Sequence, residues 1–182
     1  MLSQKLKILM YGSILWALGE GMLGPLFAVF TQRIGGDIFD ITWAWATYLL
    51  VMGIIVIIVG KISYTKERKI KIMICGFALN ALFTFGYLLV SSPLHLFIIQ
   101  IGLGIASAMS GPTWVTLYAT HGNQKQKGFE WGLVDGISHM LEAFGIIIGG
   151  LIVAYFGFNA LFITMGIIQT ISTIYQTRLM RK

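Results

Sequence analysis

The chain has 182 residues, of which 57% are hydrophobic and only 11% are charged, and its mean hydropathy is +0.82. Soluble domains carry about 25% charged residues, so this composition excludes an ordinary soluble protein. The net charge of +6 requires no nucleic-acid partner, because the basic residues are distributed as membrane topology demands.

The apolar residues come in runs long enough to cross a bilayer, which takes about 20 helical residues. In chain order, we predict six membrane-spanning helices, at about residues 8–31, 41–60, 70–90, 94–119, 129–154 and 159–176. The connections are short and are polar or contain glycine, so no soluble domain fits between the spans. The sequence therefore predicts one all-α membrane bundle of six helices over residues 1–182.

The basic residues indicate how this bundle is oriented. Twelve of the 13 lie at the termini or in the 2–3 and 4–5 connections, and Arg33 lies on the opposite side. Because basic loops stay in the cytoplasm, we expect both termini on the cytoplasmic side of the cytoplasmic membrane. The twelve are Lys5, Lys7, Lys61, Lys66, Arg68, Lys69, Lys71, Lys125, Lys127, Arg178, Arg181 and Lys182.

Two carboxylates lie near the middle of predicted spans, Glu20 in the first and Glu142 in the fifth. A charge at mid-membrane costs about 3 kcal/mol or more, so such residues usually face a bundle interior or a cavity. A carboxyl group can lower this cost by staying protonated, and a group held in that way can carry protons. We therefore expect Glu20 to bind substrate or a proton, and Glu142 is a second candidate.

Helical periodicity places further residues on the same faces as these carboxylates. Asp135 and His139 precede Glu142 at helical spacing, and Trp16 precedes Glu20 by one turn. His139 either takes part in a site or only hydrogen-bonds a neighbour. The glycines of such stripes are more typical of helix packing. With a polar and aromatic stripe on span 4, the candidate substrate- or proton-binding residues are Trp16, Glu20, Gln100, Trp114, Tyr118, His139 and Glu142.

Metal and enzyme chemistry find little support in the sequence. The i, i+3 spacing of His139 and Glu142 could bind a metal, but the zinc-protease pattern is absent and no second pair accompanies them. The chain has no Walker-type nucleotide loop and no evident nucleophile–base arrangement. We expect no metal, no other cofactor and no enzymatic activity.

Several motifs follow one another in a recognisable order. The 2–3 connection begins with "GKIS", span 4 carries "GLGIASAMSGP", and span 5 carries "GIIIGG" followed by "AYFGFNALF". On a six-span plan with cytoplasmic termini, the chain resembles one half of a major facilitator superfamily transporter. The resemblance implies a secondary transporter of an organic solute, with span 1 lining a central cavity. Because "GIIIGG" is close to an antiporter signature, we expect proton-coupled efflux of the drug type.

The chain departs from the family pattern in two informative places. Tyr64 and Thr65 stand where the loop signature has Asp-Arg, which puts the usual cytoplasmic latch in doubt. Ile98 stands where the family has an arginine before the glycine-rich part of span 4, which questions the usual route of proton coupling. Any coupling would then depend on Glu20, Glu142 or their neighbours.

A single half raises the question of its partner. Family members enclose substrate between two six-span bundles. The chain begins with Met1 and ends in a basic tail, so we expect that it need not be a fragment and that it forms a parallel homodimer. Two alternatives stay open: pairing with a different half, and a non-transporting module that stabilises a membrane partner. A water-filled cavity would favour transport, and a sealed bundle would favour the stabilising module.

The resemblance also implies where the two protomers would meet. Span 5 would pack against span 2 of the partner, with Gly145 and Gly149 allowing close approach. At the cytoplasmic rim, Asp135 would pair with the partner's Lys61 or with a neighbouring arginine. The alternative for Asp135 is a solvated surface charge.

Overall fold

The computed structural model describes residues 3–63, 65–121 and 127–180, and every regular element within these ranges is a helix. The predicted all-α class is confirmed. The predictions that fall on Met1, Tyr64, Lys125, Arg181 and Lys182 lie outside the described residues. The elements are α1 (Gln4–Gly21), α2 (Leu26–Arg33), α3 (Ile38–Ile62), α4 (Lys66–Gly86), the 3-10 turn η1 (Tyr87–Leu89), α5 (Pro93–His121), α6 (Lys127–Gln176) and the 3-10 turn η2 (Thr177–Met180).

Helices α3, α4 with η1, α5 and α6 are each long and apolar enough to cross a membrane. The first predicted span is broken into α1 and α2, which meet at an angle of 45° and form a fifth candidate span if they cross together. The break falls at a segment that contains Gly24 and Pro25, the two residue types that most often kink or end helices.

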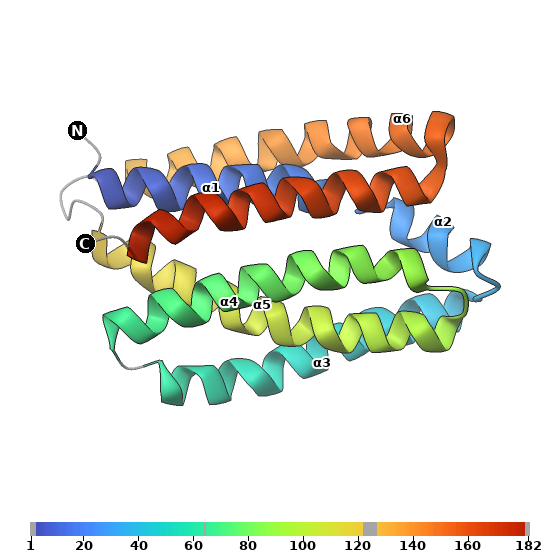
Figure 1. Cartoon of the computed structure of the whole chain (residues 1–182), viewed down its shortest axis with the longest axis horizontal. Helices are drawn as coiled ribbons and strands as arrows, with labels where there is room; N and C mark the ends of the chain where they lie inside the picture. Colours follow the sequence, from blue (N-terminus) through green and yellow to red (C-terminus); the bar gives the residue numbers. More distant parts are fainter. Residues whose placement is uncertain (1–2, 64, 122–126, 181–182) are drawn as a thin grey trace.

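Helix α6 consists of two helical arms that meet at Gly157. At this residue φ is 80° and ψ is 176°, a conformation that glycine adopts without steric penalty and other residues rarely do. Figure 1 shows that α6 reverses direction between its two arms. The arms, residues 127–156 and 158–176, contain the fifth and sixth predicted spans.

The helices fall into two groups in Figure 1, with α1 and both arms of α6 above and α3, α4 and α5 below. Helix α1 packs against α6, α3 and α4 pack against α5, and α4 also contacts α6 and so joins the groups. Helix α1 begins, α6 begins and ends, and α3 connects to α4 at one end of the bundle. We call this the terminal end, and the opposite one the α2 end.

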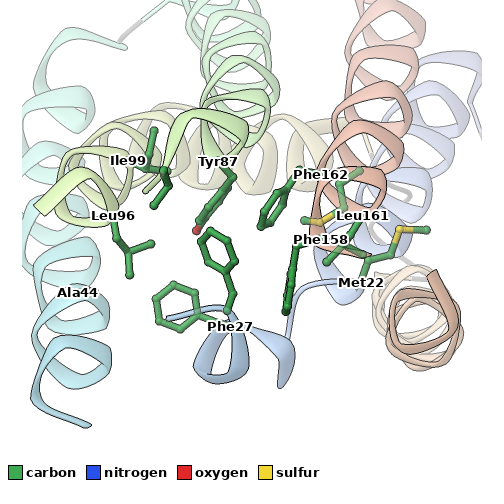
Figure 2. Packing of buried hydrophobic residues seen from close by; sticks show 12 residues of the cluster. Met22, Phe27, Ala44, Tyr87, Leu96, Ile99, Phe158, Leu161 and Phe162 are labelled. Carbon is green, nitrogen blue, oxygen red and sulfur yellow. The ribbon is translucent and has the colours of Figure 1, made fainter. Parts of the chain in front are cut away.

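Two clusters of buried apolar side chains hold the bundle together. Near the α2 end, Phe27, Tyr87, Phe158 and Phe162 belong to one cluster, shown in Figure 2, and the rings of Tyr87 and Phe162 stack at 4.8 Å between centroids. The other cluster lies toward the terminal end, and its members include Leu6, Leu9, Met73, Phe77, Leu117, Tyr118 and Val134. Along α1, α4 and α5, the residues between the two clusters include polar ones.

Glycines allow α1 and the first arm of α6 to come into backbone contact. A Cβ atom on Gly149 would overlap the carbonyl oxygen of Met22, and one on Gly145 would overlap the carbonyl oxygen of Leu18. Gly145 and Gly149 were predicted to allow close approach of a partner protomer. Within the single chain, the close approach that these glycines allow is made against α1.

Candidate functional site

A cavity of about 160 Å³ lies between the two apolar clusters and is lined by residues from all six helices. The two lining carboxylates are Glu20 and Glu142, and among the described residues no lysine, arginine or histidine lines the cavity. Its lining therefore mixes apolar side chains with polar ones, and the ionisable side chains among them can only add negative charge. The polar lining residues are Glu20, Tyr48, Asn80, Thr84, Tyr87, Gln100, Ser107, Glu142 and Gln169.

Glu20 lies in the last turn of α1, directly before the break that leads to α2. Its neighbours Gly19 and Gly21 are buried, the first against Gln169 and the second against the backbone of Glu142. These two contacts fix the end of α1, and the Glu20 side chain between them remains exposed and lines the cavity. The prediction that Glu20 lies at an internal polar site agrees with this position.

Trp16 supports this carboxylate from one turn earlier. Its indole lies beside the Glu20 side chain, where it can donate a hydrogen bond. Its ring packs against Phe77 of the terminal-end cluster at 4.7 Å between centroids. Trp16 is absent from the residues that line the cavity, so it contacts the site through Glu20 and not directly.

The polar stripe on the first arm of α6 is divided between two environments. Glu142 lines the cavity, and its Oε2 lies 3.3 Å from Nδ1 of His139. Nε2 of His139 lies 3.8 Å from Oδ1 of Asp135. The side chains of His139 and Asp135 are 71% and 73% exposed, and neither lines the cavity. The predicted alignment of the three residues is present, but only Glu142 reaches the internal site.

On α5 the structure separates the predicted site residues. Gln100 is buried and lines the cavity, and its amide nitrogen donates to the Tyr87 hydroxyl oxygen at 3.4 Å. Trp114 and Tyr118 lie farther toward the terminal end and do not line the cavity. Helix α5 is long enough for the two ends of the predicted stripe to meet different surroundings.

Several cavity residues were missed by the sequence analysis. Asn80 of α4 donates from Nδ2 to Oγ of Ser107 on α5 at 3.2 Å, and Tyr48 of α3 lies beside the same serine. Gln169 of the second α6 arm is buried, and its Oε1 has no hydrogen-bond partner among the described residues. The signal that could have found Asn80 and Gln169 was available, because each is an amide near the middle of an otherwise apolar span.

Comparison with known proteins identifies the fold to which this cavity belongs. The sequence model of the Major Facilitator Superfamily matches residues 9–180. The chain belongs to the major facilitator superfamily. An uncharacterized MFS-type transporter of Methanocaldococcus jannaschii is 26% identical over 157 residues, which are 86% of this chain and 40% of that relative. This chain thus matches less than half of that protein's length, and it is a multi-pass membrane member of a transporter family.

In this major facilitator superfamily member, Thr65 and Arg68 of the 2–3 connection make hydrogen bonds at the ends of α3 and α4. Thr65 caps α4 by accepting a hydrogen bond from the backbone N–H of Arg68 at 3.3 Å. The Arg68 side chain donates from Nη1 to the carbonyl oxygen of Ile62, the last residue of α3. Arg68 therefore ties the end of α3 to the start of α4. Lys61 lies in the last turn of α3 and is exposed.

Trp114 and Tyr118 hold helices together at the terminal end of this family member. The Trp114 indole N–H donates to the carbonyl oxygen of Leu9 at 3.2 Å, and the Tyr118 hydroxyl donates to the carbonyl oxygen of Glu130 at 2.9 Å. Their rings stack at 5.0 Å, and Trp131 contacts both edge-on. Their polar atoms are thus bonded to the backbones of α1 and α6, and neither residue lines the cavity of the single chain.

No group of three or more histidine, cysteine, aspartate or glutamate side chains that could hold a metal is found in the described part of the chain. His139, Asp135 and Glu142 follow one another along the axis of α6 and do not converge on one point. The chemistry that the cavity offers is therefore that of carboxylates, amides, hydroxyls and aromatic faces. Such groups bind solutes and exchange protons.

Proposed function

We propose that the chain is one half of a secondary transporter and that an organic solute binds in the central cavity. The observation that carries the proposal is the convergence of polar side chains from five long helices on one hollow between two apolar clusters. A module that only stabilised a membrane partner would need no such hollow. The cavity therefore favours transport over the stabilising alternative.

The proposal includes a topology of six crossings. Each arm of α6 would cross once, and the α1–α2 pair would cross as one bent span. All described basic residues except Arg33 belong to segments at or near the terminal end. Because positive charge is retained on the cytoplasmic side, we assign the terminal end to the cytoplasm.

The charge and the walls of the cavity favour an organic cation as the solute. Glu20 and Glu142 would attract a positive charge, and the lining contains no basic side chain to oppose it among the described residues. Phe27, Trp45 and Tyr48 add aromatic faces, which attract cations through their π electrons. An amphipathic amine or quaternary ammonium ion suits this combination. The "GIIIGG" segment supports export as the direction.

A second half is needed to close the cavity, and we propose a second copy in a parallel homodimer. His139 and Asp135 are largely exposed in the single half, and leaving them in hydrocarbon would cost several kcal/mol, at about 3 kcal/mol for each charge. Helix α3 is also mostly exposed and has open space around Gly53. These two surfaces are where a partner would bury the most. A different half remains the alternative partner.

The transport proposal is tested by exchange. Purified protein in liposomes should exchange internal and external radiolabelled tetraethylammonium at equilibrium, with no gradient applied. The cavity would recognise the positive charge, so an uncharged quaternary-carbon analogue should not compete. Exchange no faster than in protein-free liposomes would contradict the proposal.

The homodimer is tested by disulfide cross-linking in bilayers. Cys75 is exposed and is first replaced by serine. Cysteines at Gly53 and Gly132, which both have open space around them, should then form a cross-linked dimer. Cysteine at Gly149, which lies against α1, is the control and should not cross-link. A monomer in every bilayer condition would favour the alternative of a different partner half.

A further inference from the structure

We propose that Asp135, His139 and Glu142 form a proton path along the first arm of α6, from near the terminal end of the bundle to the cavity. The proposal rests on the proposed function, because a path for protons into the cavity is useful only if the cavity moves a solute. The path is a site separate from the one that binds the solute. Only its last member belongs to both.

The geometry gives the path its order. His139 lies between the two carboxylates, with Nδ1 3.3 Å from Glu142 Oε2 and Nε2 3.8 Å from Asp135 Oδ1. The two ring nitrogens thus face different acids, which is the arrangement that a histidine needs to take a proton on one side and release one on the other. From Asp135 to Glu142 the row covers about 10 Å of the helix.

Glu142 is the junction between the row and the cavity. Its carboxylate contacts His139 and also belongs to the cavity lining, whereas His139 and Asp135 lie outside the cavity. The backbone of Glu142 is packed against Gly21, so its position relative to the neighbouring Glu20 on α1 is fixed. A proton that arrives at Glu142 is therefore delivered next to the carboxylate that would hold a cationic solute.

Other titratable side chains lie near Glu142 and the row. Glu20 of α1 faces the same cavity, as do the phenols of Tyr48 on α3 and Tyr87 after α4. On the terminal side, Glu130 is buried and its carbonyl oxygen accepts from Tyr118. Because ionisable side chains at this depth are costly in lipid, the exposed face of the row must lie against protein or water in the assembly.

One proton passes along the row from Asp135 through His139 to Glu142. The step begins with His139 carrying its proton on Nδ1 and with Glu142 ionised. Asp135, protonated from the aqueous side, gives its proton to Nε2 through a bridging water, because the two atoms are 3.8 Å apart, and the Nδ1 proton passes to Glu142. Asp135 is left ionised, His139 is left neutral with its proton on Nε2, and Glu142 is protonated. A ring rotation or an exchange through water returns the histidine to its first tautomer.

The experiment separates proton entry from solute binding. Equilibrium exchange of tetraethylammonium requires the cavity but no net proton movement, whereas accumulation driven by a pH gradient requires both. In liposomes, His139→Ala should keep wild-type exchange and lose gradient-driven accumulation by about tenfold or more. Added imidazole should restore part of the accumulation in His139→Ala, because it can carry the proton in place of the side chain. The matched control is His95→Ala. His95 is exposed, lies outside the row and contacts Ser91.

Each result bears on a different claim. Normal gradient-driven accumulation by His139→Ala would overturn the proton path and leave the proposed function standing. Loss of exchange together with accumulation, without rescue by imidazole, would also overturn it, because the histidine would then be structural. Absence of exchange in the wild-type protein would instead overturn the proposed function itself.

Discussion

The cavity and the aromatic cluster at the terminal end contain similar residues in different situations. Trp114 and Tyr118 direct their polar atoms to backbone carbonyls of neighbouring helices. Glu20 and Gln169 keep polar atoms that line a hollow. Polar groups buried in protein need a partner, and those in the cluster find one within the fold. In the cavity, a solute can supply the missing partner.

This difference gives a physical criterion that separates stabilising from ligand-binding polar residues within membrane spans. A polar side chain bonded to another helix stabilises the fold, and its removal should lower stability. A polar side chain that lines a hollow is available for ligands, and its removal should lower binding with little loss of stability. Substitutions that exchange these two outcomes would break the comparison.

The largest expected effect is on stability, from truncation of Tyr118. Tyr118→Ala removes a fully buried ring, and loss of such a ring costs about 3–5 kcal/mol of folding free energy. The matched variant is Tyr48→Ala, at a half-buried tyrosine of the cavity wall, which should lower stability less and weaken cation binding more. Thermal unfolding in detergent, with ligand binding in parallel, checks both. Equal stability losses would break the comparison.

The next effect is on transport, from removal of the Glu20 charge. Glu20→Gln should slow tetraethylammonium exchange at sub-saturating concentration by about 30-fold, because losing one member of a desolvated charge pair costs about 2 kcal/mol. Glu142→Gln should slow the exchange less than Glu20→Gln does and should lose gradient-driven accumulation. Glu67→Gln, at an exposed carboxylate in the first turn of α4, is the control. A larger loss of exchange in Glu142→Gln than in Glu20→Gln would reverse the assigned roles.

A smaller effect is expected at the contact between α1 and α6, which holds the two cavity carboxylates near each other. Gly149→Ala places a methyl group against the Met22 backbone and should cost about 1–3 kcal/mol of stability. Gly150→Ala is the matched control, because nothing lies within 4 Å of its added Cβ atom. Unfolding of the two variants under the same conditions gives the difference. A control as unstable as Gly149→Ala would show that the α1 contact is not the cause.

The smallest effect is expected from the removal of a single hydroxyl group. Tyr118→Phe removes the donor to the Glu130 carbonyl and should cost about 1 kcal/mol of stability, with normal cation exchange. Tyr48→Phe removes a cavity hydroxyl and should change stability less than exchange. Tyr118→Phe should have the larger effect on stability, and Tyr48→Phe should have the larger effect on exchange. Slower exchange in Tyr118→Phe than in Tyr48→Phe would mean that the terminal-end cluster takes part in transport.

The sequence was sufficient to predict the helical class and the family, because long apolar runs and motif order are local properties of the chain. The break between α1 and α2 was missed, since hydropathy summed over residues 8–31 does not register one bend at Gly24 and Pro25. Helical spacing also correctly aligned Asp135, His139 and Glu142 on one face.

Which helix packs against a given helix face is decided by the tertiary fold. The sequence was less informative about these contacts. Trp114 and Gln100 share a stripe on α5, but Trp114 meets Leu9 of α1 and Gln100 meets Tyr87. Gly145 and Gly149 were correctly expected in a close helix contact, but the contacting helix is α1 of the same chain. Periodicity gives the face of a helix but does not name the helix opposite.

The central claim is that the cavity binds an organic cation through Glu20, and its most direct test is an affinity measurement. Tetraethylammonium binding is measured by calorimetry on wild type, Glu20→Gln and Tyr118→Phe, each in lipid nanodiscs at the same pH. We expect equal affinity for wild type and Tyr118→Phe, and about 30-fold weaker binding for Glu20→Gln. Equal affinity in wild type and Glu20→Gln would contradict the claim.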